Sequence, residues 1–107
     1  MKGAGMIATA RIELPTKRIE AFCSKHGVEE FSLFGSVLRD DFLPDSDVDV
    51  MLKFKPGFGF TFENTPEIQD ELEAMFGRPV DVIEKGAITN PFRRHAILSS
   101  YQVVYAA

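Results

Sequence analysis

A chain of 107 residues and 12.0 kDa, 45% apolar and 26% charged, has the size and composition of one compact domain, which excludes a second. Its 12 basic and 16 acidic residues give a net charge of −4, which argues against direct binding of DNA or RNA. The one cysteine, Cys23, cannot form an internal disulfide, and no apolar run is long enough for a membrane span or a secretory signal. We therefore expect a cytoplasmic protein that contacts neither nucleic acid nor membrane.

The first half of the chain is expected to form two helices and two strands. Between Pro15 and Gly27, apolar residues recur at three- and four-residue steps, which is the period of a helix. Val48, Val50 and Leu52 alternate with other residues, which is the period of a strand with one apolar face. In chain order, the pattern predicts an irregular arm at 1–14, a helix at 15–26, a strand at 28–34, a short helix at 37–42 and a strand at 47–54.

The second half of the chain is expected to add two helices and one strand. Ile68, Leu72 and Met75 fall on one stripe of a helix that Gly77 ends. Its elements are a helix at 65–76, a strand at 80–83 and a last helix at 90–101 that carries Tyr101. With a domain at 15–107, this order predicts an α/β (α+β) fold, a small mixed β-sheet flanked by helices.

Carboxylates are concentrated in the segment 40–49, which holds five aspartates in ten residues. Like charges this close raise one another's pKa values unless a cation is present. Asp47 and Asp49 are two residues apart on the predicted strand, so their side chains leave the same face about 7 Å apart. Asp81 lies between two valines on the next strand. The three carboxylates are therefore expected to converge on a divalent metal.

A Gly-Ser pair lies ten residues before the acidic pair. Gly35 and Ser36 fall between a predicted strand and a short helix, where glycine lets a phosphate approach the backbone. On its own, the dipeptide is better explained as a turn with a helix cap. Its spacing from Asp47 and Asp49 favours a phosphate site beside a metal site.

The pattern Gly35-Ser36, ten residues, Asp47-x-Asp49 resembles the nucleotidyltransferase superfamily of DNA polymerase beta, and within it the minimal nucleotidyltransferase (MNT) domains. The segments 33–39, 44–50 and 77–83 carry this resemblance. One departure is Asp40, where many relatives have glycine, because it adds a negative charge near the phosphate site.

The resemblance implies transfer of a nucleoside monophosphate with two Mg²⁺ ions, one to activate the attacking hydroxyl and one to steady the pyrophosphate. Arg39 either contacts phosphates or pairs with a neighbouring acid. The nucleotide-binding residues implied are Gly35, Ser36 and Arg39, and the catalytic, metal-binding residues are Asp47, Asp49 and Asp81, of which Asp81 also helps to deprotonate the acceptor.

The resemblance also implies a biological role. Stand-alone MNT proteins are similar to antitoxins of HEPN-domain ribonuclease toxins, and some transfer AMP from ATP to a toxin tyrosine, as in a type VII-like toxin–antitoxin pair. We therefore expect ATP as substrate and a hetero-oligomer with a HEPN toxin. The alternative is a non-catalytic antitoxin that masks its partner by contact alone.

Three further groups of residues allow more than one interpretation. Phe58, Phe60 and Phe62 favour core packing, with a partner surface and base stacking as alternatives. Residues 93–95, Arg-Arg-His, favour a solvated helix face over contact with an acidic partner or a nucleotide. Cys23 lies on the apolar stripe of the first helix and is expected in the core.

Overall fold

A computed structural model of the chain describes residues 14–39 and 42–107, so residues 1–13 of the arm expected at 1–14 lie outside the described residues, as does Asp40. Leu14 packs against the core. Within the described ranges, no helix is long and apolar enough to cross a membrane. The elements in chain order are α1 (Thr16–His26), β1 (Val28–Phe34), the short 3-10 helix η1 (Gly35–Leu38), β2 (Val48–Phe54), α2 (Asn64–Phe76), β3 (Val80–Glu84), α3 (Pro91–Leu98) and β4 (Gln102–Ala106).

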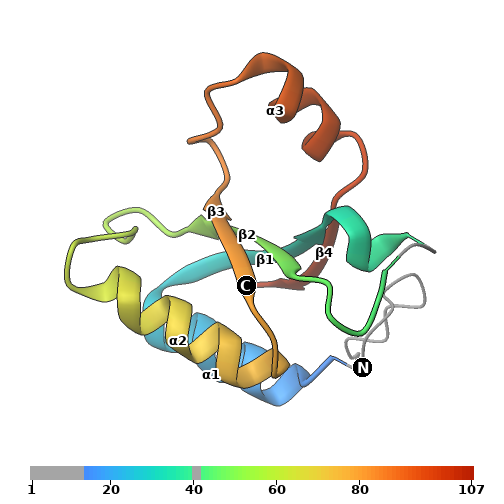
Figure 1. The fold of residues 1–107 in the computed structure, drawn as a ribbon. Helices are drawn as coiled ribbons and strands as arrows, with labels where there is room; N and C mark the ends of the chain where they lie inside the picture. The colour runs from blue at the N-terminus through green and yellow to red at the C-terminus, as the bar shows by residue number, and fades with distance from the viewer. Residues whose placement is uncertain (1–13, 40–41) are drawn as a thin grey trace.

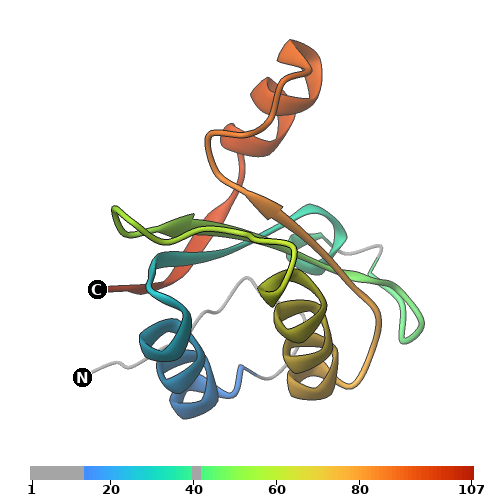
Figure 2. The same ribbon diagram turned by 90° about the vertical axis from the view of Figure 1, so that its left-hand side faces the viewer.

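The four strands form one mixed sheet in the order β3-β2-β1-β4. Strand β1 pairs antiparallel with both β2 and β4, whereas β2 pairs parallel with β3. Helices α1 and α2 lie side by side against one face of the sheet, and α3 projects from the other (Figures 1 and 2). The expected mixed sheet flanked by helices is confirmed.

The two faces of the sheet have cores of different size. The larger core fills the space between the sheet and the helices α1 and α2, and it includes Cys23, as expected, at 1% exposure. The smaller one joins Ile97 of α3 to Phe34 and Met51. Because successive strand residues point to opposite faces, the buried Val48 and Val50 leave the residue between them on the α3 side.

The last helix is shorter than the pattern predicts, and the strand after it was not predicted. Helix α3 ends at Leu98, where the Ser99 amide donates to the carbonyl of His95 at 3.0 Å, so Tyr101 lies outside the helix. Strand β4 then pairs with β1. The sequence does not mark this strand because Val103, Val104 and Tyr105 are apolar in succession, and a short apolar run without alternation does not distinguish a strand from the end of a helix.

The short helix is also displaced from its expected range. It begins at Gly35 rather than at residue 37, and the backbone is already extended at Arg39, with φ −119° and ψ 163°. The amide of Arg39 donates to the carbonyl of Ser36 at 2.9 Å, which closes the single turn. The expected range of 37–42 is therefore wrong at Arg39 and at Phe42, neither of which is helical, and residues 40–41 lie outside the described part.

The segment that carries α3, residues 86–100, leaves the sheet after β3 and returns to it at β4. A contact between the residues that flank this segment joins its two ends. Lys85 follows β3 and donates from Nζ to the Tyr101 hydroxyl at 3.0 Å, with the ammonium also 4.7 Å from the ring centroid. The same ammonium pairs with Glu30 of β1 at 3.2 Å. The chain thus leaves and re-enters the sheet at fixed points.

Candidate active site

Strand pairing brings two of the three predicted carboxylates side by side. In the parallel pairing of β2 with β3, Asp49 stands opposite Asp81. Both alternate with buried valines that face α1 and α2, so both side chains lie on the α3 side of the sheet. Asp47 precedes β2 directly and is exposed. The structure thus sets Asp49 beside Asp81 with Asp47 just before β2, and the convergence of all three on a metal stays a prediction.

The negative charges of Asp47 and Asp81 both act on the carboxylate of Asp49. Partial burial, together with the charges of Asp81 and Asp47, raises the pKa of Asp49 to about 6, against opposing effects of Arg39 and Arg93. A divalent cation bound between the carboxylates would relieve this repulsion, and an all-oxygen donor set suits Mg²⁺. The residues present therefore fit a magnesium site.

Gly35 lies directly against Asp49. The residue before it, Phe34, is the partner of Asp49 in the pairing of β1 with β2. Gly35 has φ 75°, in the left-handed region, and a Cβ atom on it would overlap the Asp49 carboxylate. Glycine is therefore required both by the backbone and by the neighbouring side chain. The predicted phosphate site and the predicted metal site are adjacent.

Ser36 and Arg39 lie in and directly after η1, the turn that begins beside Asp49. Ser36 is partly buried in this turn. Arg39 is exposed, and its charge opposes the rise in the pKa of Asp49, which places the guanidinium within electrostatic range of the carboxylates. Contact of Ser36 and Arg39 with a phosphate stays a prediction.

Sequence reasoning assigned no role to Arg78, which fixes the loop before Asp47. Its Nη1 donates to the carbonyls of Leu43 and Ser46 at 3.2 and 3.1 Å, and its guanidinium lies 4.7 Å from the ring centroid of Phe42. These acceptors are backbone atoms more than thirty residues away along the chain. No sequence pattern indicates such a contact.

A second arginine, Arg93, is exposed, as expected for a solvated helix face, but it also faces the site. Arg93 of α3 lies with Nη2 3.5 Å from Oδ2 of Asp81. The signal that could have found it is its spacing from Ile97, the buried residue of α3, because positions four apart share one helix face. Arg94 and His95 are exposed, as expected.

The phenylalanine segment divides between core and surface. Phe60 packs edge-on against Phe54 at 5.2 Å between ring centroids, so core packing is confirmed for this residue. Phe58 is 56% exposed, although its ring covers Gly27, and Phe62 is fully exposed. The expectation of core packing is therefore wrong for Phe62.

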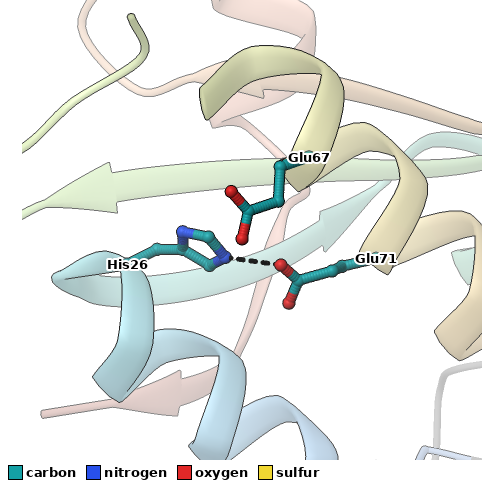
Figure 3. A group of neighbouring side chains, drawn as sticks. All are labelled: His26, Glu67 and Glu71. Atoms are coloured by element: carbon teal, nitrogen blue, oxygen red, sulfur yellow. Dashed lines mark hydrogen bonds and ion pairs between the residues drawn. The ribbon is translucent and has the colours of Figure 1, made fainter. Parts of the chain in front are cut away.

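A different acidic group lies across the sheet from this site, between α1 and α2 (Figure 3). His26, Glu67 and Glu71 place one ligand atom each within 4.8 Å of the others, which the three aspartates do not. Lys25 already pairs with both glutamates, at 2.8 and 3.0 Å, and His26 Nε2 lies 3.0 Å from Glu71. This group is a link between two helices in which Lys25 already pairs with both glutamates.

Comparison with known sequences shows extensive similarity to one family. The profile of the nucleotidyltransferase domain matches residues 16–104. A chain from Methanocaldococcus jannaschii, assigned as a protein adenylyltransferase, is 32% identical over 85 residues, which are 79% of this chain and 85% of the relative. The protein adenylyltransferase MntA of Thermococcus cleftensis is 30% identical over 89 residues, which are 70% and 82% of the two chains.

Comparison with solved structures shows the same fold. A structure described as a minimal nucleotidyltransferase has a TM-score of 0.62 at 26% identity, covering 84% of this chain and 89% of its own. A toxin–antitoxin complex with AMP-PNP has a TM-score of 0.69 at 14% identity, covering 88% and 75%. A tri-AMPylated Shewanella oneidensis HEPN toxin bound to its MNT antitoxin matches with a TM-score of 0.61 at 13% identity, covering 85% and 69%. From its profile match, its relatives and its fold, the chain belongs to the nucleotidyltransferase domain family, in which it resembles the minimal nucleotidyltransferases.

Proposed function

We propose that the chain is a Mg²⁺-dependent protein adenylyltransferase that transfers AMP from ATP to a tyrosine hydroxyl of a HEPN toxin, and so acts as the antitoxin. The observation that carries this proposal is the parallel register that sets Asp49 opposite Asp81, with Gly35 against Asp49. The protein adenylyltransferase names of the relatives support the reaction, and the toxin–antitoxin complexes among the similar structures support the partner. We place the reaction in the cytoplasm, where ATP and Mg²⁺ are available.

We assign the site residues as follows. Gly35 and Ser36 receive the triphosphate at the start of η1, and Arg39 contributes positive charge there. Asp47, Asp49 and Asp81 hold two Mg²⁺ ions, which when bound neutralise charge on the phosphates and favour the ionised form of the acceptor hydroxyl. We also assign Asp81, which is exposed, the role of helping to remove the hydroxyl proton.

The proposed reaction is a single exchange at phosphorus. The tyrosine oxygen bonds to the α-phosphorus of ATP, the bond between that phosphorus and the bridging oxygen breaks, and pyrophosphate leaves with the bonding electrons. The hydroxyl proton passes to Asp81 and then to solvent. The tyrosine gains bulk and a negative charge, which disfavours RNA at the toxin's site.

Intact mass spectrometry of the partner toxin tests this proposal. We expect the toxin to gain the mass of one or more AMP groups after incubation with this chain, ATP and Mg²⁺. Asp47→Asn and Asp49→Asn should abolish the gain, because each removes a carboxylate ligand. Asp70→Asn, which removes an exposed carboxylate on α2, is the matched control and should retain full transfer. Transfer that survives both site substitutions would refute the catalytic assignment.

A second function, masking of the toxin by contact alone, is favoured by the exposed phenylalanines. Phe62 is fully exposed and Phe92 is 86% exposed, which is unusual for this residue type. If this function holds, Asp49→Asn neutralises the toxin without any change in its mass, whereas Phe62→Ser folds normally and loses the complex. Loss of neutralisation in Asp49→Asn with the complex intact would leave adenylylation as the function.

A further inference from the structure

Helix α3 is docked on the sheet by its one buried residue, Ile97, and this docking brings Arg93 to the candidate active site. Ile97 is 7% exposed and packs with Phe34 and Met51, whereas every other residue of α3 is exposed. Arg93 lies four positions before Ile97, on the same helix face. The contact that docks α3 therefore also directs Arg93 toward the sheet.

The contact that Arg93 makes is a weak one. Its Nη2 atom lies 3.5 Å from Asp81 Oδ2, and both side chains are 52% exposed. Exposed ion pairs of this length contribute little free energy, so the guanidinium can leave Asp81 at small cost. Its positive charge also opposes the rise in the pKa of Asp49, so it acts on two of the three carboxylates.

Space is available for the guanidinium to move. Arg93 lines a pocket of about 360 Å³ beside β3, which Phe60, Ile83, Ile88 and Asn90 also line. The side chain thus lies between Asp81, with which it pairs, and a pocket that it lines together with the acidic Glu84. Its position is not fixed by burial.

Charge determines which partner Arg93 prefers. Without metal, the three aspartates attract the guanidinium. When Mg²⁺ is held by the same carboxylates, their charge is neutralised, and a nucleoside triphosphate becomes the dominant anion beside α3. Arginine suits this exchange because its guanidinium binds carboxylates and phosphates with similar geometry.

We propose that Arg93 is a nucleotide-binding residue that exchanges Asp81 for the phosphates of the nucleoside triphosphate when metal binds. This proposal rests on the proposed function, since it assigns a further ligand for the same substrate. In the metal-free protein, Arg93 competes with metal for Asp81. In the loaded protein, it holds the nucleotide and joins α3 to it.

Binding measurements on Arg93→Ala test the exchange, because its two consequences have opposite signs. Mn²⁺ without nucleotide should bind about two- to fivefold more tightly, since an exposed competing cation has been removed. AMP-PNP with saturating Mg²⁺ should bind about tenfold or more weakly, since a hydrogen bond to a charged group is lost. Arg93→Lys should recover much of the AMP-PNP affinity because it keeps the charge.

Arg94→Ala is the matched control, since Arg94 is the neighbouring exposed arginine of α3 and should change neither affinity. Unchanged AMP-PNP binding in Arg93→Ala would overturn the proposal, and so would an equal loss in Arg94→Ala. Loss of both Mn²⁺ and AMP-PNP affinity, with a lower Tm, would show a structural role for Arg93 and would also overturn it.

Failure of the proposed function has a different signature. If the unsubstituted protein binds no AMP-PNP and modifies no partner, the nucleotidyltransferase assignment itself falls, and the inference with it. If the unsubstituted protein transfers AMP and Arg93→Ala binds AMP-PNP equally well, only the role of Arg93 is refuted.

Discussion

At the scale of single residues, Gly35 shows how one position serves both the backbone and the site. Its φ of 75° is costly for any other residue, and the space where a Cβ would lie holds the Asp49 carboxylate. The first constraint concerns stability and the second concerns the reaction. Substitutions at different glycines can therefore separate the effect on stability from the effect on transfer activity.

Gly35→Ala should lose about 1–2 kcal/mol of stability from backbone strain, and should also lose transfer activity because Asp49 is displaced. Gly77→Ala is the matched control, since Gly77 has φ 69° and no atom within 4 Å of the position a Cβ would take. It should show a similar fall in Tm and retain AMP transfer. Equal transfer by both variants would contradict the close approach of Gly35 to Asp49.

Asp49→Asn should stabilise the metal-free protein at neutral pH while removing metal binding. The folded-state pKa of about 6 is above the ordinary value of 3.8, so ionised Asp49 destabilises the fold above about pH 6. The penalty begins above the ordinary value, where the unfolded chain ionises, and is fully present above the folded-state pKa. The gain in Tm should therefore be largest at about pH 7.5 and disappear by about pH 4. A constant gain across this range would contradict the raised pKa.

At the scale of elements, the site is made by strands and held by loops. The alternation of Val48 and Val50 is enough to predict β2 and to place Asp49 away from the helix-covered face. The loop that delivers Asp47 has no such pattern and depends on Arg78, which holds it through two backbone carbonyls. The position of Asp49 thus follows from sequence periodicity, whereas the position of its neighbour Asp47 depends on a tertiary contact.

Arg78→Lys should weaken metal binding more than it lowers stability. Lysine keeps the charge but cannot donate from a planar group to two carbonyls while lying over the Phe42 ring. We expect Mn²⁺ affinity to fall about three- to tenfold, the loss of about one hydrogen bond, with a Tm change of only a few degrees. Unaltered Mn²⁺ titrations would show that Asp47 needs no support from this loop.

The sequence predicts most elements because their local signals agree with the fold. Helices α1 and α2 end at glycines with φ 69°, and both are predictable from an apolar stripe and a terminal glycine. Strand β4 and the early end of α3 are not predictable, because they depend on pairing with the distant β1 and not on apolar periodicity. The role of Arg93 depends on the same long-range geometry.

At the scale of the whole molecule, the sheet separates a structural half from a reactive half. One face packs against α1 and α2, where Lys25 and His26 hold Glu71. The other face carries Asp49 and Asp81. Because the sheet and its core lie between the two groups, we expect substitutions on opposite faces to act independently.

Glu71→Gln should lower stability without changing metal or nucleotide binding. Burial acts to raise the pKa of Glu71, but hydrogen bonds from Lys25 and His26 hold it below its ordinary value. Its stabilising effect is therefore present above about pH 4.5 and lost as pH falls through the lower folded-state value. We expect a cost of up to about 1 kcal/mol at neutral pH.

Glu20→Gln, which changes an exposed glutamate of α1, is the control for this prediction and should alter Tm little. In a double variant with Asp49→Asn, the two Tm changes should add. A marked departure from additivity, or altered AMP-PNP affinity in Glu71→Gln, would show that the faces are coupled.

The contact between Lys85 and Tyr101 has a consequence for how this architecture can vary. It fixes where the chain leaves β3 and where it returns to β4, so the register of both strands is set outside the excursion between them. Within residues 86–100, the docking of Ile97 and the approach of Arg93 to Asp81 are therefore the two constraints that tie the segment to the site. The length and the other exposed positions of this segment can change while the aspartates on the sheet keep their places.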